Sequence, residues 1–276
     1  MAATTLVSIK PRMSVAEDTL ATLKSRGSVQ MGFSNEAPFS YQLPNGQLAG
    51  IDYDVMQHVF AALGIPRIEG VLTPFASLIP ALEAGRFDAI ATGLYIRPDR
   101  CRQVLFTEPT LVVRAAVMVP TGNPKRIHSF QDIAANSAFR LGYVLGGTTA
   151  VPLAGGVAQG QLIGFTDVVT AVAALKTGRV DGLMRTSIDA ARIVSEDTAK
   201  TIEVASPFKE PLKNGKEILD YIAFAFPMAQ KDLVAAFNRQ LAGFLGSAAH
   251  RALLTKYNIT DQRYPIPETT SEICAG

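Results

Sequence analysis

One arginine in the sequence is placed where it could bind a carboxylate. Arg100 follows Phe87–Ala91, a short apolar run that predicts a buried strand. The segment beyond the C-terminal end of a strand in a parallel sheet borders the crevice in which such folds bind ligands. A guanidinium there can hold a carboxylate through two parallel hydrogen bonds. On position alone, however, a surface ion pair between Arg100 and Asp99 is the favoured interpretation.

A glycine turn further along the chain is a second candidate for binding an anion. Gly146-Gly147-Thr148-Thr149 resembles a phosphate-binding loop but lacks its lysine. We expect it to lead into a helix over Thr148–Ala154, whose free backbone N–H groups could bind a carboxylate.

Catalytic and metal-binding motifs are missing from the sequence. There is no nucleophile elbow, no P-loop and no HExxH zinc motif. His58, His128 and His250 are far apart, and a lone histidine is usually a surface or core residue. The sequence therefore favours a binding protein over an enzyme and implies no cofactor and no metal.

Cys101 and Cys274 are the two cysteines of the chain and lie far apart in it. Because there is no CxxC pair and no histidine-rich companion, a metal site is disfavoured. The cysteines could be two unpaired buried thiols or one long-range disulfide formed in an oxidising compartment. Both lie in polar, loop-like surroundings, which favours the disulfide.

The composition is that of a globular protein large enough for two domains. The 276 residues are 48% hydrophobic and 18% charged, and two domains of about 100–150 residues fit this length. The net charge is only +2, with Lys and Arg scattered, which argues against a nucleic-acid partner. No apolar stretch approaches the roughly 18 residues of a membrane span.

The first residues lack a signal-peptide pattern, which alone predicts a cytoplasmic protein, whereas a signal removed before Met1 would suit the disulfide. Both interpretations stay open.

Strands and helices are expected to alternate along the chain. Apolar runs predict strands at Ser28–Phe33, Phe87–Ala91, Phe139–Val144 and Val180–Met184. Helical periodicity predicts helices at Ser14–Ser25, Ile51–Leu63, Phe75–Ala84, Thr148–Ala154, Asp167–Lys176, Lys231–Leu245 and Ala248–Tyr257. This order predicts an α/β fold in which helices pack on parallel sheets.

Two short apolar segments that end in proline, Ala115–Pro120 and Tyr221–Pro227, are expected to cross between two lobes. We therefore assign residues 1–115 and 226–276 to lobe 1 and residues 116–225 to lobe 2. A two-strand hinge of this kind suits closure around a ligand. A single doubly wound domain with an extension is the alternative, which the chain length disfavours. A repeated pattern of helix, Gly, Arg, Asp and strand at Leu82–Ile90 and Leu175–Leu183 also indicates two similarly built lobes.

Several strings resemble the periplasmic substrate-binding proteins of polar amino-acid ABC importers, in the same order over nearly the whole chain. They are Asn35–Phe39, Gly50–Val55, Leu78–Leu82, Phe87–Arg100 and Gly147–Thr149. The resemblance implies the two-lobe type II periplasmic-binding-protein fold, with Arg100 holding the ligand carboxylate and the Thr148–Thr149 turn assisting it. It also implies a monomer that delivers its ligand to an ABC permease. Such a protein would lie in the periplasm or outside the cell, either free or attached to lipid or membrane.

Two departures from this family pattern bear on the ligand. Amino-acid binders usually carry Ser or Thr at the position of Tyr95, and an Asp for the α-ammonium at the position of Thr186. Phe39, Phe75 and Tyr95 instead occupy family pocket positions, although Phe39 and Phe75 could equally be core residues. Aromatic rings attract a delocalised or alkylated cation, by ~0.5–2 kcal/mol per contact. Glu36 could add a hydrogen-bonding anion.

Within the family, the chain is most similar to the branch that binds ectoine and hydroxyectoine. Cys101 and Cys274 match that branch, which supports the disulfide, whereas Phe75 and Tyr95 exchange Phe and Tyr relative to it. Arg185 is additional, and as a second carboxylate anchor it could redirect specificity to another zwitterion or a dicarboxylate. The expected ligand-binding residues are Glu36, Phe39, Phe75, Gly93, Tyr95, Arg100, Gly147, Thr148, Thr149, Arg185 and Thr186.

Three other functions remain as alternatives. The first is a polar amino-acid-binding protein of the same family. The second is an enzyme similar to cyclohexadienyl dehydratase, for which Glu36 is the only evident general acid. The third is the sensor domain of a receptor, which the lack of a membrane span disfavours.

Overall fold

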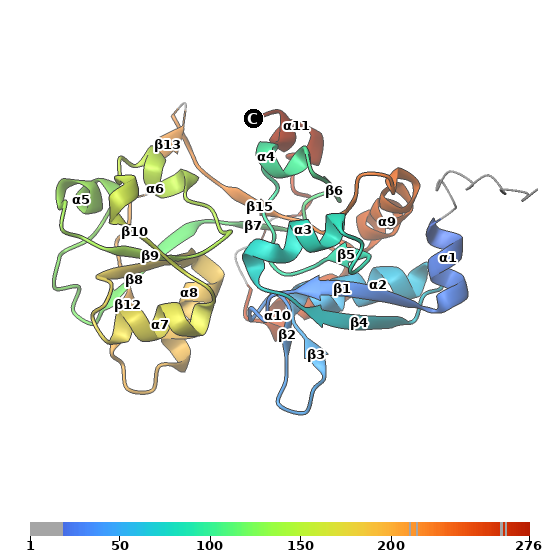
Figure 1. Ribbon diagram of the computed structural model, residues 1–276, viewed down its shortest axis with the longest axis horizontal. Helices are drawn as coiled ribbons and strands as arrows, with labels where there is room; N and C mark the ends of the chain where they lie inside the picture. The colour runs from blue at the N-terminus through green and yellow to red at the C-terminus, as the bar shows by residue number, and fades with distance from the viewer. Residues whose placement is uncertain (1–18, 210, 214, 260–261, 263) are drawn as a thin grey trace, which may run out of the picture.

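The computed structural model describes residues 19–209, 211–213, 215–259, 262 and 264–276. It has two α/β lobes that lie side by side and are joined by a narrow connection (Figure 1). The expected two-lobe α/β architecture is therefore confirmed. Residues 14–18 of the first predicted helix lie outside the described residues, and the rest of that helix is α1 (Thr19–Arg26). The start of the chain, on which the signal-peptide question depends, also lies outside them.

The first sheet has the strand order β4-β1-β5-β16-β6. Its strands are β1 (Ser28–Phe33), β4 (Arg67–Leu72), β5 (Ala89–Ile90), β6 (Val104–Phe106) and β16 (Ala225–Pro227). Strand β1 is parallel to β4 and β5, whereas β16 is antiparallel to β5 and β6, so the sheet is mixed. Helices α2 (Ile51–Ala62), α9 (Lys231–Phe244) and α10 (Ala248–Lys256) cover one face, and η1 (Phe75–Ser77) with α3 (Leu78–Glu83) covers the other.

The second sheet repeats this plan in the order β10-β9-β11-β8-β12. Its strands are β8 (Ala115–Pro120), β9 (Leu141–Val144), β10 (Leu162–Phe165), β11 (Gly182–Thr186) and β12 (Ile202–Val204). Strands β9, β10 and β11 are parallel, and β8 is antiparallel to both of its neighbours. Helices α5 (Phe130–Ala135) and α6 (Ala150–Ala154) pack on one face, and α7 (Val168–Lys176) and α8 (Ser187–Glu196) pack on the other.

Alternation along β8 explains why the second sheet carries helices on both faces. Val117 and Val119 contribute to the core under α5, whereas Ala116 and Met118 contribute to the core under α7 and α8. Successive side chains of a strand point to opposite faces, so an unbroken apolar run must be covered on both. The longest described helix, α9, has 14 residues, and none of the described helices has the length and apolarity needed to cross a membrane.

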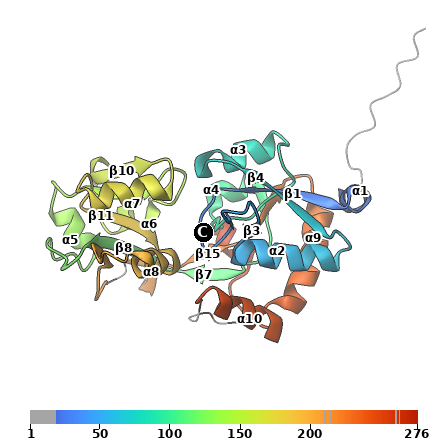
Figure 2. The same cartoon turned by 90° about the horizontal axis from the view of Figure 1, so that it is seen from below.

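The lobes are joined where β7 (Leu111–Val113) pairs antiparallel with β15 (Asp220–Ile222) (Figures 1 and 2). The segment Ala115–Pro120, expected as a crossing, is strand β8 of the second sheet, and the end of Tyr221–Pro227 is β16 of the first. The first joining strand, β7, thus lies just before its expected segment, whereas the second, β15, overlaps the start of Tyr221–Pro227. We propose to keep residues 1–115 with 226–276, and 116–225, as the two lobes.

Most expected helices and strands are present with boundaries that differ by one to a few residues. The expected helix Phe75–Ala84 begins as the 3-10 turn η1, and the expected strand Phe87–Ala91 shortens to β5. The expected helix Thr148–Ala154 begins only at Ala150, because Thr149 takes the N-cap position. Short elements complete the chain: β2 (Tyr41–Gln42), β3 (Leu48–Ala49), α4 (Pro98–Cys101), η2 (Gln159–Gln161), β13 (Leu212–Lys213), β14 (Lys216–Glu217) and α11 (Thr270–Ala275).

The repeated sequence pattern folds into the same loop in each lobe. Gly85 after α3 has φ +68°, and Gly178 after α7 has φ +71°, a left-handed conformation that favours glycine at the end of a helix. Three residues later, the carboxylate of Asp88 accepts a hydrogen bond from Gln30 N, and that of Asp181 accepts one from Arg140 N, both at 2.8 Å. Each aspartate thus ties its loop to the segment beside it in the same lobe.

Candidate functional site

A cavity between the two lobes is lined by most of the residues expected to bind a ligand. The cavity is partly open to solvent. The expected residues in its lining are Glu36, Phe39, Phe75, Gly93, Tyr95, Arg100, Gly147, Thr148, Arg185 and Thr186. Thr149 is not among the lining residues. The residues that the sequence did not predict are Ala115, Tyr143, Val144, Met184 and Asp220.

Arg100 is buried in the short helix α4, which begins after the N-cap Arg97 with Pro98 in its first turn. Its Nη1 donates to Tyr95 O at 2.9 Å and its Nη2 donates to Gly146 O of lobe 2 at 2.7 Å. Burial lowers its pKa to about 10, so the guanidinium stays charged near neutral pH. Since a guanidinium has five N–H groups, three remain for a ligand.

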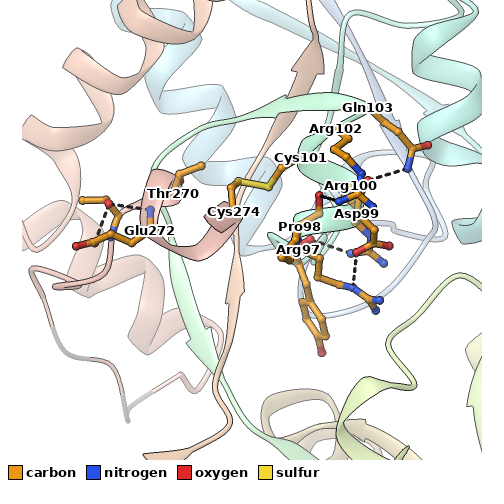
Figure 3. Close-up of a disulfide and its surroundings, with 12 residues drawn as sticks. Arg97, Pro98, Asp99, Arg100, Cys101, Arg102, Gln103, Thr270, Glu272 and Cys274 are labelled. Carbon is orange, nitrogen blue, oxygen red and sulfur yellow. Dashed lines mark hydrogen bonds and ion pairs between the residues drawn. A yellow bond between two sulfur atoms is a disulfide. The ribbon is translucent and has the colours of Figure 1, made fainter. Parts of the chain in front are cut away.

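The disulfide favoured from the sequence is present and lies directly beside Arg100. Cys101 of α4 is bonded to Cys274 of α11, with 5.9 Å between the two Cα atoms (Figure 3). Helix α11 is itself closed by a capping box, in which Thr269 and Glu272 bond each other's backbone N–H. The surface ion pair that competed with the carboxylate interpretation involves Arg97, whose Nε donates to Asp99 Oδ1 at 3.1 Å.

The floor of the cavity on lobe 1 is aromatic. Phe39 is buried against Gly93, where a Cβ would lie 2.8 Å from the ring, and Gly93 also has φ +70°. Only glycine fits this position without strain. Gly93 N donates to the buried carboxylate of Asp52 at 2.6 Å, and burial raises the pKa of Asp52 to about 7.

The other two aromatic residues are half-buried, so their rings can reach the cavity. The Cζ atom of Arg100 lies 5.8 Å from the centre of the Phe75 ring. Tyr95 is held by a β-bridge to Ile222 of β15, and burial raises the pKa of its hydroxyl well above the usual range. The hydroxyl therefore stays protonated and can donate to a ligand.

Glu36 and Arg185 face each other across the cavity, from lobe 1 and lobe 2. Arg185 Nη2 and Glu36 Oε2 are 3.5 Å apart, and Arg185 Nε donates to Asp189, which is fully buried behind it. Burial raises the pKa of Glu36, whereas the charge of Arg185 lowers it. Arg185 therefore lines the cavity, but part of its charge is already balanced by two carboxylates.

Hydroxyl groups on lobe 2 complete the wall opposite the aromatic rings. Thr148 Oγ1 accepts from Ala150 N at 3.2 Å, and Thr186 Oγ1 accepts from Asp189 N at 3.0 Å as the N-cap of α8. Both hydroxyls are buried, and each keeps its proton for donation to a group in the cavity. Both threonines thus present donors where the sequence lacks a carboxylate.

Asp220 is the charged residue of the cavity that sequence reasoning missed. It lies on β15, where it pairs with Val113 of β7 in the connection between lobes. Burial raises its pKa to about 6, and the charges of Arg97 and Arg100 lower it. The signal that could have found it is an acidic residue directly before the apolar segment Tyr221–Pro227.

Further contacts join the lobes around the cavity. Arg192 Nε of α8 donates to Ala37 O of lobe 1 at 3.1 Å. A Cβ at Gly146 would lie 2.7 Å from Ala76 Cα, so lobe 2 touches lobe 1 there through glycine. With the contacts of Arg100 and Arg185, these define a closed arrangement of the lobes. Among the described residues, no group of three or more His, Cys, Asp or Glu side chains could hold a metal ion.

Comparisons with known proteins agree with this architecture. The model of the bacterial extracellular solute-binding proteins, family 3, matches residues 29–260. A probable amino-acid ABC transporter periplasmic-binding protein of Sinorhizobium fredii is 34% identical over 264 residues, covering 94% of this chain and 86% of that protein. The crystal structure of EhuB in complex with hydroxyectoine has a TM-score of 0.85 at 28% identity, covering 94% of this chain and 99% of that one.

A more distant structure shares the fold alone. It is an ancestral amino acid-binding protein described as a precursor of cyclohexadienyl dehydratase, with a TM-score of 0.73 at 24% identity over 87% of this chain and 99% of that one. The resemblance found in the sequence and the two-lobe fold that it implied are both confirmed.

Proposed function

Because this chain belongs to family 3 of the bacterial extracellular solute-binding proteins, we propose that it captures a small zwitterionic carboxylate by closure of its lobes and delivers it to an ABC permease. The observation that carries this proposal is the position of Arg100. Its guanidinium is buried and charged in the cavity wall, has N–H groups left for a ligand, and lies beside aromatic rings. We place the protein in the periplasm or outside the cell, as a monomer.

In the proposed complex, lobe 1 supplies the main contacts. Arg100 holds the carboxylate, assisted by the hydroxyl of Thr148 from lobe 2, while Phe39, Phe75 and Tyr95 surround the cation. Rings that face a desolvated cation contribute about 2 kcal/mol or more. This set favours a ring or alkylated cation, as in ectoine or hydroxyectoine, and the 28% identity to EhuB supports the same class.

A polar amino acid is the second candidate, and a specific observation favours it. The Sinorhizobium fredii relative is described as a probable amino-acid ABC transporter periplasmic-binding protein. Catalysis is not proposed, because the family model that matches this chain is one of solute-binding proteins. The expected general acid, Glu36, has its pKa raised by burial, but its carboxylate faces the guanidinium of Arg185 at 3.5 Å.

A thermal-shift panel separates these candidates. We would screen ectoine, hydroxyectoine, proline, glycine betaine, arginine, glutamate and prephenate, since a ligand at 100 times its dissociation constant adds about 2.7 kcal/mol of stability. Ectoine should stabilise the protein most. Stabilisation by α-amino acids but not by ectoine would refute the ectoine class, and turnover of prephenate would refute the binding-protein assignment.

Variants at two neighbouring arginines test the anchor. Arg100→Ala should abolish binding of every carboxylate ligand, because Arg185, the other guanidinium in the cavity lining, is already bonded to Asp189 and faces Glu36. Arg102→Ala is the matched control, since Arg102 is exposed and bonds Pro98 O of its own helix. Equal affinities of the Arg100→Ala variant and the wild type would remove Arg100 from the site.

A further inference from the structure

We propose that Asp220 recognises the ligand directly, by accepting a hydrogen bond from an N–H or ammonium group that the ligand carries next to the carboxylate held by Arg100. This inference rests on the proposed function and narrows its ligand class. It favours zwitterions with a protonated nitrogen beside the carboxylate over fully alkylated betaines.

The backbone around Asp220 is fixed on two sides. Asp220 pairs with Val113 of β7, and the following residues bond the loop that leads to Arg100: Ile96 N donates to Tyr221 O at 2.8 Å, and Ala223 N donates to Leu94 O at 3.1 Å. The carboxylate is thereby held at the cavity wall close to the carboxylate anchor. A group placed by regular backbone pairing keeps its position when a ligand enters.

The charges near Asp220 leave it available to a ligand. Arg97 is paired with Asp99, and two N–H groups of Arg100 are bonded to the carbonyls of Tyr95 and Gly146. Among the described residues, no ion pair or hydrogen bond joins the Asp220 carboxylate to either arginine. It is a half-buried carboxylate that faces the cavity, and within the described part of the chain no cationic side chain is bonded to it.

Glu36 differs from Asp220 in this respect. Its carboxylate faces Arg185 at 3.5 Å, so a cationic group of the ligand would have to compete with a guanidinium there. The position expected to carry an ammonium-binding acid holds Thr186, and Asp189 behind it is fully buried and bonded to Arg185 and Arg192. Asp220 is thus the acid best placed to receive a donor beside the ligand carboxylate.

Matched ligands and variants test the inference. The probes with an N–H beside the carboxylate are ectoine, L-proline and L-arginine, and the probes without one are glycine betaine and N,N-dimethyl-L-proline. Titration calorimetry should show that Asp220→Asn weakens the N–H probes by about tenfold or more, and the betaines by no more than about threefold. Asp232→Asn is the control, because Asp232 is an exposed carboxylate in the first turn of α9 that does not line the cavity. This control variant should leave the affinity for both classes of probe unchanged.

The outcomes separate the inference from the proposed function. The inference would be overturned if the Asp220→Asn variant bound an N–H probe as tightly as the wild type does, or if it lost equal affinity for the N–H probes and the betaines. Either result would leave the family function in place. Binding of betaines alone by the wild type would overturn the inference as well. No binding of any probe by the folded wild type would overturn the proposed ligand class itself.

If the wild type binds no betaine, the pH profile decides. The groups that act on Asp220 are Arg97, Arg100 and Tyr95, and Glu36 also titrates across the cavity. Affinity for an N–H probe should fall as the pH drops through about 6, where Asp220 takes up its proton. The Asp220→Asn variant should lose that part of the profile and keep the part due to Glu36. An identical profile for both proteins would overturn the inference.

Discussion

Replacing Gly146 by alanine should weaken ligand binding without touching a ligand contact. In the closed arrangement, the new Cβ would lie 2.7 Å from Ala76 Cα and 2.9 Å from Ala76 N, both backbone atoms of the opposite lobe. Overpacking of this kind costs about 1–3 kcal/mol, because backbone must move. The cost exists only when the lobes close, so the dissociation constant should rise about 5- to 150-fold.

Backbone strain is the competing effect, and Gly178→Ala controls for it. Gly146 has φ +83° and Gly178 has φ +71°, but a Cβ at Gly178 would meet no atom within 4 Å. Both variants should lose about 1–2 kcal/mol of lobe 2 stability from the left-handed conformation. Only Gly146→Ala should weaken binding, as measured by calorimetry with the probe that the panel identifies. It should also leave the liganded protein more open in small-angle scattering.

Two results would refute this reasoning. Unchanged affinity of Gly146→Ala would mean that the bound protein does not bring Gly146 against Ala76. Equal losses of affinity in Gly146→Ala and Gly178→Ala would assign the effect to strain within lobe 2.

Two further predictions concern stability. Burial raises the pKa of Asp52 to about 7 from a usual value near 3.8. Between these two pH values the folded protein holds a proton that the unfolded chain has released. The stability of the fold therefore falls as the pH rises from about 4 to about 7. Asp52→Asn should therefore gain up to roughly 4 kcal/mol relative to wild type between pH 4 and 8 in urea titrations, and parallel pH profiles would contradict this. Replacing Cys101 and Cys274 together by serine should lower the unfolding free energy by about 2–5 kcal/mol, because the bond closes a loop across 173 residues; an unchanged urea midpoint would contradict it.

The sequence contained enough information to place the site residues that lie in continuous motifs. Arg100 and Phe39 lie in the strings Phe87–Arg100 and Asn35–Phe39, which run in the order of a known family, and both line the cavity. The sequence could not decide between Thr148 and Thr149, because a shift of one residue in a turn changes which side chain faces the cavity. In the structure Thr149 is the N-cap of α6, and Thr148 lines the cavity.

Residues brought in by sheet register were harder to predict. Tyr143 and Met184 lie on β9 and β11, and which face of the strand they occupy depends on pairing that a single sequence does not contain. Asp220 depends on pairing between β15 and β7, more than a hundred residues apart in sequence. The segment Ala115–Pro120 proved to be a strand of the second sheet, and only the start of Tyr221–Pro227 belongs to the joining strand β15, because a short apolar run that ends in proline is typical of a hinge strand and of a sheet strand alike.

The charges around the cavity limit which ligand the closed protein can hold. Three guanidinium groups and three carboxylates lie in or directly behind its wall: Arg100, Arg185, Arg192, Glu36, Asp189 and Asp220. With Asp220 ionised the charges of these six groups sum to zero, so a neutral zwitterion can be buried without adding net charge. A dicarboxylate would instead add two negative charges to the closed cavity. Arg185 could still be a second carboxylate anchor only if the ligand displaced Glu36 or Asp189 from it. The same balance places the two charges of the ligand: its carboxylate at Arg100, and its cation between the aromatic rings and Asp220.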